Sequence, residues 1–160
     1  MKILIVDDEL IIAKHLEFLL NSAGYECEAC SNPLSALETF KKNKFDAVIT
    51  DFVMPEMNGI ELMREIKKID SKIRVIMITA YGDIDTAIDA INNKIYSFFT
   101  KPINIPNFMN MLNDLKNEIQ LEKERDNEII MLIEENKKNR KGNNILLDNL
   151  DKVSDNVEFF

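Results

Sequence analysis

Short apolar runs alternate with amphipathic segments through the first two thirds of the chain. Three of the runs, ILIV, AVI and VIMI, are apolar at every position. Such runs are typical of parallel strands that are covered by helices on both faces. The pattern predicts strands over residues 2–6, 25–30, 47–50, 74–79 and 97–99.

Helix start and stop signals lie between these runs. A helix is expected over residues 9–23, ended by Gly24, and a second begins at Asn32-Pro33 and ends near residue 42. Further helices are expected to be capped by Asn58, Asp83 and Asn104. Five β/α alternations predict an α/β fold with an open, doubly wound, five-stranded parallel sheet.

The character of the chain changes at Phe108, where a heptad pattern begins. Its positions are Phe108, Leu112, Leu115, Ile119, Glu122, Asp126, Ile129, Ile133, Asn136 and Arg140. The pattern predicts one helix to about residue 141, ended by Gly142, and a second, short helix over residues 145–160. We therefore expect a domain over residues 1–120 and a helical extension over 121–160, acting as a coiled-coil relay or linker. Helices that fold back on their own domain are the alternative.

The composition excludes several classes of protein. A formal net charge of −8 argues against direct nucleic-acid binding, which requires a basic face. No apolar run approaches the roughly 20 residues that span a bilayer, and the N-terminus becomes acidic at Asp7, unlike a signal peptide. We expect a cytoplasmic protein that binds neither membranes nor nucleic acid directly.

The two cysteines, Cys27 and Cys30, have the spacing of a metal or redox pair. They lie in a predicted strand, where residues three apart point to opposite faces. We therefore expect two ordinary cysteines, one in the core and one near the end of the strand.

Chemically active side chains lie at or just after the ends of four of the predicted strands. Asp7 and Asp8 follow the first strand, Asp51 the third, Thr79 ends the fourth and Lys101 follows the fifth. Because ligands of open α/β sheets bind at the carboxyl ends of the strands, we expect these five residues to converge. Each alone has an ordinary explanation, such as a helix cap or a loop charge, but their conjunction indicates a site.

Three carboxylates at one edge need a compensating cation. Two bare carboxylates about 4 Å apart repel by roughly 4 kcal/mol at an effective dielectric constant near 20. Mg²⁺ fits, because it is a hard ion that prefers oxygen ligands. A metal, a lysine and a hydroxyl beside a carboxylate suit phosphoryl transfer, and the carboxylate itself can be the nucleophile.

Four segments carry a resemblance to a known family: ILIVDDE, ITDFVMPEMNG, VIMITAYGD and YSFFTKP. With these segments, the chain from Met1 to about Gln120 resembles the receiver domain of bacterial two-component response regulators. The resemblance implies the flavodoxin-like receiver fold and a role in phosphorelay signal transduction. It also implies a signalling protein and not an enzyme. Its only catalysis would be its own phosphotransfer and slow autodephosphorylation.

The resemblance implies a role for each site residue. Asp51 matches the phosphoacceptor. The phosphoryl group that it accepts is expected to come from a sensor histidine kinase, a phosphotransfer protein or a small acyl phosphate. The Mg²⁺ ligands are expected to be Asp7, Asp8, Asp51 and the backbone carbonyl of Val53, with Asp8 the more direct ligand of the acidic pair. Thr79 matches the switch hydroxyl, Lys101 the lysine that pairs with the phosphoryl group, and Phe98 the aromatic residue that turns inward with Thr79. The Lys101–Pro102 bond is expected to be cis.

One departure from the family lies before the fifth strand. The usual Gly-Ala pair aligns with Lys94-Ile95, and Asn93 is expected to supply the left-handed conformation of the missing glycine.

Three alternatives differ in class. A haloacid dehalogenase-type phosphatase also uses a Mg²⁺-bound Asp nucleophile, but it needs D-x-D after the first strand. A flavodoxin-like electron carrier needs a hydroxyl-rich phosphate loop where this chain has Asp7-Asp8-Glu9. A receiver-like scaffold without phosphorylation is disfavoured because all five site residues are present. The helical extension further predicts a homodimer through the fifth-helix region and the C-terminal helices, whereas no effector domain is identifiable.

Overall fold

The computed structural model describes residues 1–80, 92 and 94–154, and for residues 139–154 the backbone alone. The helix expected after Asp83 lies outside the described residues, as does Asn93. The chain forms two compact units, Met1–Leu112 and a second that begins at Asn113.

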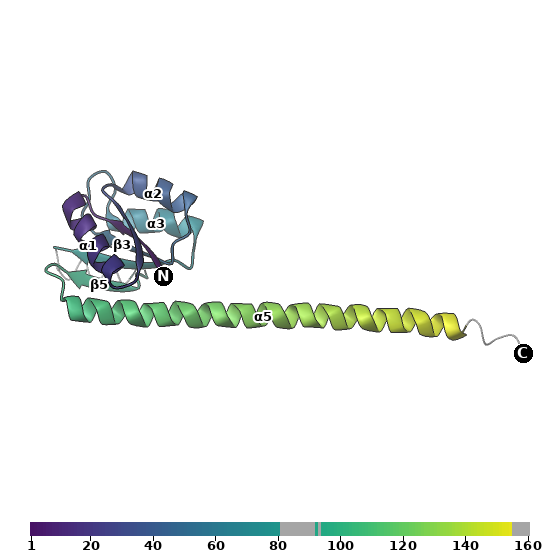
Figure 1. The fold of residues 1–160 in the computed structure, drawn as a ribbon. Helices are drawn as coiled ribbons and strands as arrows, with labels where there is room; N and C mark the ends of the chain where they lie inside the picture. Colours follow the sequence, from purple (N-terminus) through teal and green to yellow (C-terminus); the bar gives the residue numbers. More distant parts are fainter. Residues whose placement is uncertain (81–91, 93, 155–160) are drawn as a thin grey trace, which may run out of the picture. The chain divides into compact units, whose positions relative to one another are not determined.

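The first unit contains a five-stranded parallel sheet in the order β2-β1-β3-β4-β5 (Figure 1). The strands are β1 (Lys2–Val6), β2 (Glu26–Cys30), β3 (Ala47–Asp51), β4 (Arg74–Thr79) and β5 (Ser97–Thr100). All five predicted strands are present, each within one residue of its expected bounds. The reversal of strand order at β1 and β3 places their carboxyl ends at the crevice where doubly wound sheets bind ligands.

Helices connect the strands and begin where the sequence predicted. They are α1 (Leu10–Ser22), α2 (Pro33–Lys42), α3 (Gly59–Ile69) and α5 (Ile105–Ser154). The side chains of Asn32, Asn58 and Asn104 accept hydrogen bonds from backbone N–H groups in the first turns of α2, α3 and α5. After α1, Gly24 has a φ of 85°, which a residue without a Cβ adopts without strain.

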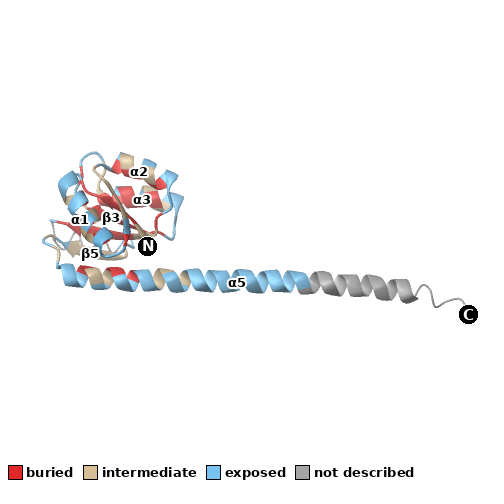
Figure 2. Ribbon diagram, viewed as in Figure 1, coloured by how far each residue is buried: buried red, intermediate tan, exposed pale blue. Residues whose placement is uncertain are grey.

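The core lies on both faces of the sheet, because β1, β3 and β4 each contain a run of consecutive buried apolar residues (Figure 2). On one face, Leu4, Val48 and Met77 pack with the buried side of α2 and α3. On the other, the Phe99 ring of β5 meets the Phe108 ring of α5 edge-on, with centroids 5.1 Å apart. Burial on both faces fixes the strand register and therefore the residues at the carboxyl edge.

The predicted end of the fifth helix at Gly142 is wrong. Helix α5 continues through Gly142 to Ser154, so residues 145–154 belong to α5 and are not a separate helix. One glycine inside a helix costs only about 1 kcal/mol relative to alanine, and no proline follows it to remove a hydrogen bond. A glycine ends a helix when the chain adopts the left-handed conformation there, and Gly142 keeps helical geometry.

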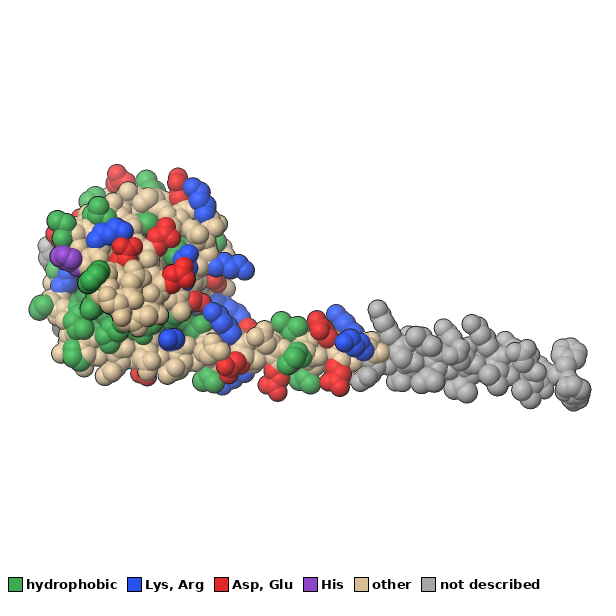
Figure 3. Space-filling view, in the orientation of Figure 1, with side chains coloured by type: hydrophobic (Ala, Val, Ile, Leu, Met, Phe, Trp, Pro, Cys, Tyr) green, Lys and Arg blue, Asp and Glu red, His purple; other side chains and the backbone are tan. Residues whose placement is uncertain are grey.

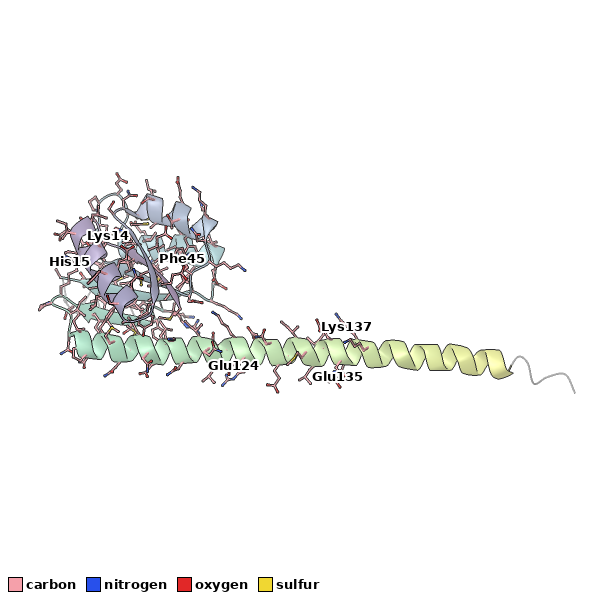
Figure 4. The ribbon with its side chains drawn as sticks, in the orientation of Figure 1. Lys14, His15, Phe45, Glu124, Glu135 and Lys137 are labelled. Carbon is pink, nitrogen blue, oxygen red and sulfur yellow. The ribbon has the colours of Figure 1, made fainter. Side chains whose placement is uncertain are left out.

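The second unit consists of α5 from Asn113, and it exposes apolar residues among charged ones (Figure 3). Leu121 and the run Ile129–Ile133 are each about half exposed. Charged side chains such as Glu124, Glu135 and Lys137 project from the same helix (Figure 4). Within the described residues, no helix is both long and apolar enough to cross a membrane.

Candidate functional site

Three carboxylates meet at the carboxyl edge of the sheet. Asp7 and Asp8 follow the last residue of β1, and Asp51 is the last residue of β3. One oxygen from each lies within 4.8 Å of the others. Asp7 and Asp51 are buried, at 6% and 8% exposure, whereas Asp8 is exposed. The predicted convergence of the three is therefore confirmed.

Lys101 links the two buried carboxylates. Its Nζ donates hydrogen bonds of 2.9 Å to Asp7 Oδ2 and 2.6 Å to Asp51 Oδ2. Its backbone N–H donates to the carbonyl of Thr79, 2.8 Å away, which anchors the end of β5 to the end of β4. The Lys101–Pro102 peptide bond is cis, as predicted.

The charge of Lys101 is stabilised by this position. Burial alone lowers the pKa of the Lys101 ammonium, but the hydrogen bonds and charges of Asp51 and Asp7 outweigh it and raise the pKa above the ordinary lysine value. Lys101 therefore remains protonated at neutral pH, and it offsets one of the three negative charges.

Backbone N–H groups orient the other oxygen of each buried carboxylate. The Glu9 N–H donates to Asp7 Oδ1 over 2.9 Å, and the Val53 N–H donates to Asp51 Oδ1 over 3.1 Å. Each carboxylate is thus held on one side by the backbone and on the other by Lys101. A side chain held at both oxygens is already oriented for reaction, which reduces the reorganisation that catalysis requires.

Gly59, the first residue of α3, closes the loop behind Asp51. Its N–H donates to the Phe52 carbonyl over 2.9 Å, and a Cβ at this position would lie 2.3 Å from the backbone oxygen of Asp51. Only glycine permits this approach. No role was predicted for Gly59 from the sequence, although the motif contains a glycine eight residues after Asp51.

A small, mostly apolar cavity lies beside the charged groups. Its lining includes Ile5, Leu16, Ile49 and Ile78 in addition to Asp7, Asp51 and Lys101. Apolar walls lower the local dielectric constant, so charges at the site interact more strongly than they would in water.

The donor set fits a hard divalent cation. Three carboxylate oxygens within 4.8 Å of one another are the ligands that Mg²⁺ prefers, and the exposed Asp8 leaves one side open to water or substrate. Lys101 offsets only one of the three charges, so a cation would remove the remaining repulsion.

The remaining predicted residues lie near this edge. Thr79 is fully buried at the end of β4, one residue beyond Ile78, which pairs with Asp51 across the sheet. Phe98 pairs with Met77 and packs, partly buried, against the core on the α2–α3 face. The structure thus places both on strands next to the carboxylates, and their switching roles remain predictions.

The departure before β5 is described at Lys94, whereas the expectation for Asn93 lies outside the described residues. Lys94 itself has a φ of 55°, so the residue aligned with the family's glycine takes the left-handed conformation.

Both cysteines are free thiols, and neither belongs to the acidic group that is suited to a metal among the described residues. Burial raises the pKa of Cys27 to about 12, with the charge of Glu17 as the next cause. Both are partly buried, and Cys30 is the last residue of β2 and packs against the α2–α3 core.

Comparison with known protein families gives one assignment. The family model of the response regulator receiver domain matches residues 3–113. The match contains every residue of the site and gives no support to the dehalogenase-type phosphatase alternative.

Individual relatives agree with this match. Chemotaxis protein CheY of Bacillus subtilis is 36% identical over 117 residues, which cover 72% of this chain and 98% of that protein. Sporulation initiation phosphotransferase F of the same species is 39% identical over 104 residues, or 65% of this chain and 84% of that protein. The transcriptional regulatory protein ZraR of Klebsiella oxytoca is 39% identical, but the chain spans only 23% of its length.

Solved structures have the same fold. A receiver domain protein from Clostridium thermocellum superposes with a TM-score of 0.70 at 36% identity, covering 75% of this chain and 97% of that one. The response regulator TrrA of Thermotoga maritima, solved in complex with Mg²⁺ and BeF, has a TM-score of 0.64 at 30% identity, covering 71% and 97%.

Proposed function

Because the chain belongs to the response regulator receiver domain family, we propose that Asp51 is its phosphoacceptor. A carboxylate oxygen of Asp51 attacks phosphorus, and the bond from phosphorus to the donor breaks as the new O–P bond forms. The donor is a phosphohistidine of a sensor histidine kinase or phosphotransfer protein, or a small acyl phosphate. The product is an acyl phosphate on Asp51.

The single observation that best supports this proposal is the position of Lys101 between Asp51 and Asp7. The ammonium that now binds Asp51 Oδ2 is close enough to bind an oxygen of a phosphoryl group attached there. Lys101 would stabilise the negative charge on that group in the transition state and in the product.

We assign the metal ligands to Asp7, Asp8, Asp51 and the backbone carbonyl of Val53. When bound, Mg²⁺ would supply positive charge for the phosphoryl oxygens. Asp7 and Asp51 hold fixed orientations through the N–H groups of Glu9 and Val53, and the exposed Asp8 completes the acidic group.

Thr79 and Phe98 are proposed as the switch. Thr79 ends the strand beside Asp51, so a small movement would bring its hydroxyl toward a phosphoryl oxygen. Phe98, which lies partly buried on the neighbouring strand β5, would turn inward as Thr79 moves.

The test is labelling with radioactive acetyl phosphate in the presence of Mg²⁺. The unaltered chain should take up at most one phosphoryl group, whereas Asp51→Asn should take up none. Asp114→Asn, at an exposed position on α5, removes the same charge and should label normally. Undiminished labelling of Asp51→Asn would overturn the assignment and show that another residue accepts the phosphoryl group. No labelling of the unaltered chain would favour the scaffold alternative.

The proposal includes the absence of rapid turnover. Each chain should be labelled once and lose its phosphoryl group slowly, as expected of a signalling protein. Fast multiple turnover of a phosphomonoester would contradict this. The cytoplasmic location also stays a prediction.

We further propose that α5 pairs with the α5 of a second copy. The heptad positions Ile129 and Ile133 are about half exposed, and apolar residues at this spacing become buried when two helices pair. Glu122 and Asp126 occupy the two heptad positions that precede Ile129 in the sequence. Because these side chains are charged, the pairing would be weak and adjustable. Phosphorylation of Asp51 would act on this equilibrium.

A further inference from the structure

A hollow lined by basic side chains lies at the opposite end of β4 from the carboxylates. Its volume is about 370 Å³, and its lining includes Lys67, Lys72, Arg74 and Lys94. Strand β4 has six residues, so its two ends are about 17 Å apart. None of the lining residues belongs to the proposed phosphorylation site.

The four cations come from separate segments of the first unit. Lys67 is in the last turn of α3, Lys72 in the turn after it, Arg74 opens β4 and Lys94 precedes β5. The one carboxylate of this turn, Asp70, accepts a hydrogen bond from the Lys72 N–H over 2.9 Å. Because the whole chain carries a net charge of −8, this gathering of cations is not a consequence of composition.

Hydrogen bonds to the backbone hold two of these cations in place. The Lys67 ammonium donates to the carbonyl of Lys94 over 2.8 Å, and the Arg74 guanidinium donates to the carbonyl of Lys72 over 2.6 Å. Lys94 is positioned by its left-handed backbone, with a φ of 55°. The hollow is therefore built by contacts between segments that are up to 27 residues apart in sequence.

The cations are close enough to disfavour one another. Burial lowers the pKa of Lys67, and the charges of Lys94 and Arg74 lower it further. A bound anion would offset this repulsion and stabilise the charged form of Lys67.

We propose that this hollow binds a small phosphorylated molecule. A phosphate group matches the planar donors of Arg74 and the ammonium groups of Lys67, Lys72 and Lys94. Ile95 and the ring of Tyr96 form an apolar part of the lining, which suits the organic portion of a phosphate ester. The volume falls in the range of about 300–1,000 Å³ that is usual for small-molecule sites.

The test is a titration of the isotopically labelled full chain, followed by its amide NMR signals. Inorganic phosphate and AMP serve as probes, without Mg²⁺ and at slightly alkaline pH, where both carry about two negative charges. Saturable shifts are expected for the amides of residues 71–75 and 94–96. Tighter binding of AMP would identify an organic phosphate as the ligand, and equal binding would identify the free ion.

A matched pair of variants makes the test specific. Lys72→Gln/Lys94→Gln should weaken binding about tenfold, because charge-assisted contacts to the phosphate are lost. Lys41→Gln/Lys44→Gln removes two exposed cations elsewhere and should leave binding unchanged. Shifts that never saturate, shifts at other amides, or equal weakening in both variants would overturn the proposal.

The two sites can fail separately. Labelling of Asp51 by acetyl phosphate should be the same in Lys72→Gln/Lys94→Gln as in the unaltered chain, because neither residue contacts the carboxylates. The labelling assay therefore reports on Asp51 whether or not the hollow binds phosphate.

Discussion

Lys101 Nζ lies 2.6 Å from Asp51 Oδ2 and 2.9 Å from Asp7 Oδ2, so one ammonium bridges two buried carboxylates that are 44 residues apart in sequence. The bridge both stabilises the fold and keeps Asp51 in position. Its removal should therefore affect stability and chemistry together.

Lys101→Met should lower the free energy of unfolding by about 1–2 kcal/mol without Mg²⁺. The variant leaves Asp7 and Asp51 buried without their cation, and the loss is limited because solvent screens the Lys101 side chain, which is 20% exposed. Urea denaturation measures the change, and Mg²⁺ should restore part of the loss. Lys14→Met, which removes an exposed cation paired with Glu17, serves as the control.

The same interaction predicts a pH dependence. Because the pKa of Lys101 is raised in the folded protein, its stabilising contribution is fully present below the ordinary lysine pKa. The contribution is lost as the pH rises through the folded-state value. The stability difference between the unaltered chain and Lys101→Met should therefore be constant near neutral pH and shrink in strong alkali. A difference that grows in alkali would contradict the bridge.

Asp8→Asn should weaken Mg²⁺ binding at least about tenfold, because it removes one of three charges around the ion. Isothermal titration calorimetry gives the dissociation constant. Glu9→Gln removes a charge from the next residue, outside the acidic group, and should have a much smaller effect. Equal weakening by the two variants would indicate a general charge effect and no direct ligand role for Asp8.

Gly59→Ala should destabilise the fold by about 1–3 kcal/mol and slow the labelling of Asp51. The added Cβ would lie 2.3 Å from the Asp51 backbone oxygen, so the loop must move. Gly24→Ala is the control, because the added Cβ would meet no atom within 4 Å. The φ of 85° at this position is unfavourable for alanine. This variant should cost about 1 kcal/mol and leave labelling unchanged. Normal labelling of Gly59→Ala would show that the close approach does not position Asp51.

Ile129→Lys/Ile133→Lys should weaken any self-association of the chain about tenfold or more, because both residues occupy the proposed seam of α5. Light scattering over a range of concentrations measures the mass, with Mg²⁺ alone and with beryllium fluoride added. Ile11→Lys/Phe18→Lys changes two exposed apolar residues of α1 and is the control. A chain that stays monomeric at high concentration under both conditions would exclude the pairing.

The sequence predicted the sheet and the carboxylate site for a physical reason. Fully apolar runs such as Ile3–Val6 form buried strands, and parallel strands bring the residues that follow them to one edge. Local signals also sufficed for the Asn caps, because Asn32 and Asn58 bond to N–H groups only three residues away. Asp7, Asp8, Asp51 and Lys101 were found by this reasoning.

Features that depend on distant contacts were not predictable in the same way. The close approach of Gly59 to Asp51 and the bond from Lys67 to Lys94 exist only once the loops have packed. The continuity of α5 through Gly142 was not predicted, because a glycine signals a helix end without determining it. Whether a glycine ends a helix depends on the residues around it.

The central claim, that Asp51 carries the phosphoryl group, is tested most directly by borohydride reduction after treatment with acetyl phosphate and Mg²⁺. Reduction converts an aspartyl phosphate to homoserine, which peptide mass spectrometry locates by position. We predict homoserine at position 51 and at no other aspartate. Homoserine at Asp7 or Asp8 would contradict the account, as would phosphate retained on Thr79 or no modification at all.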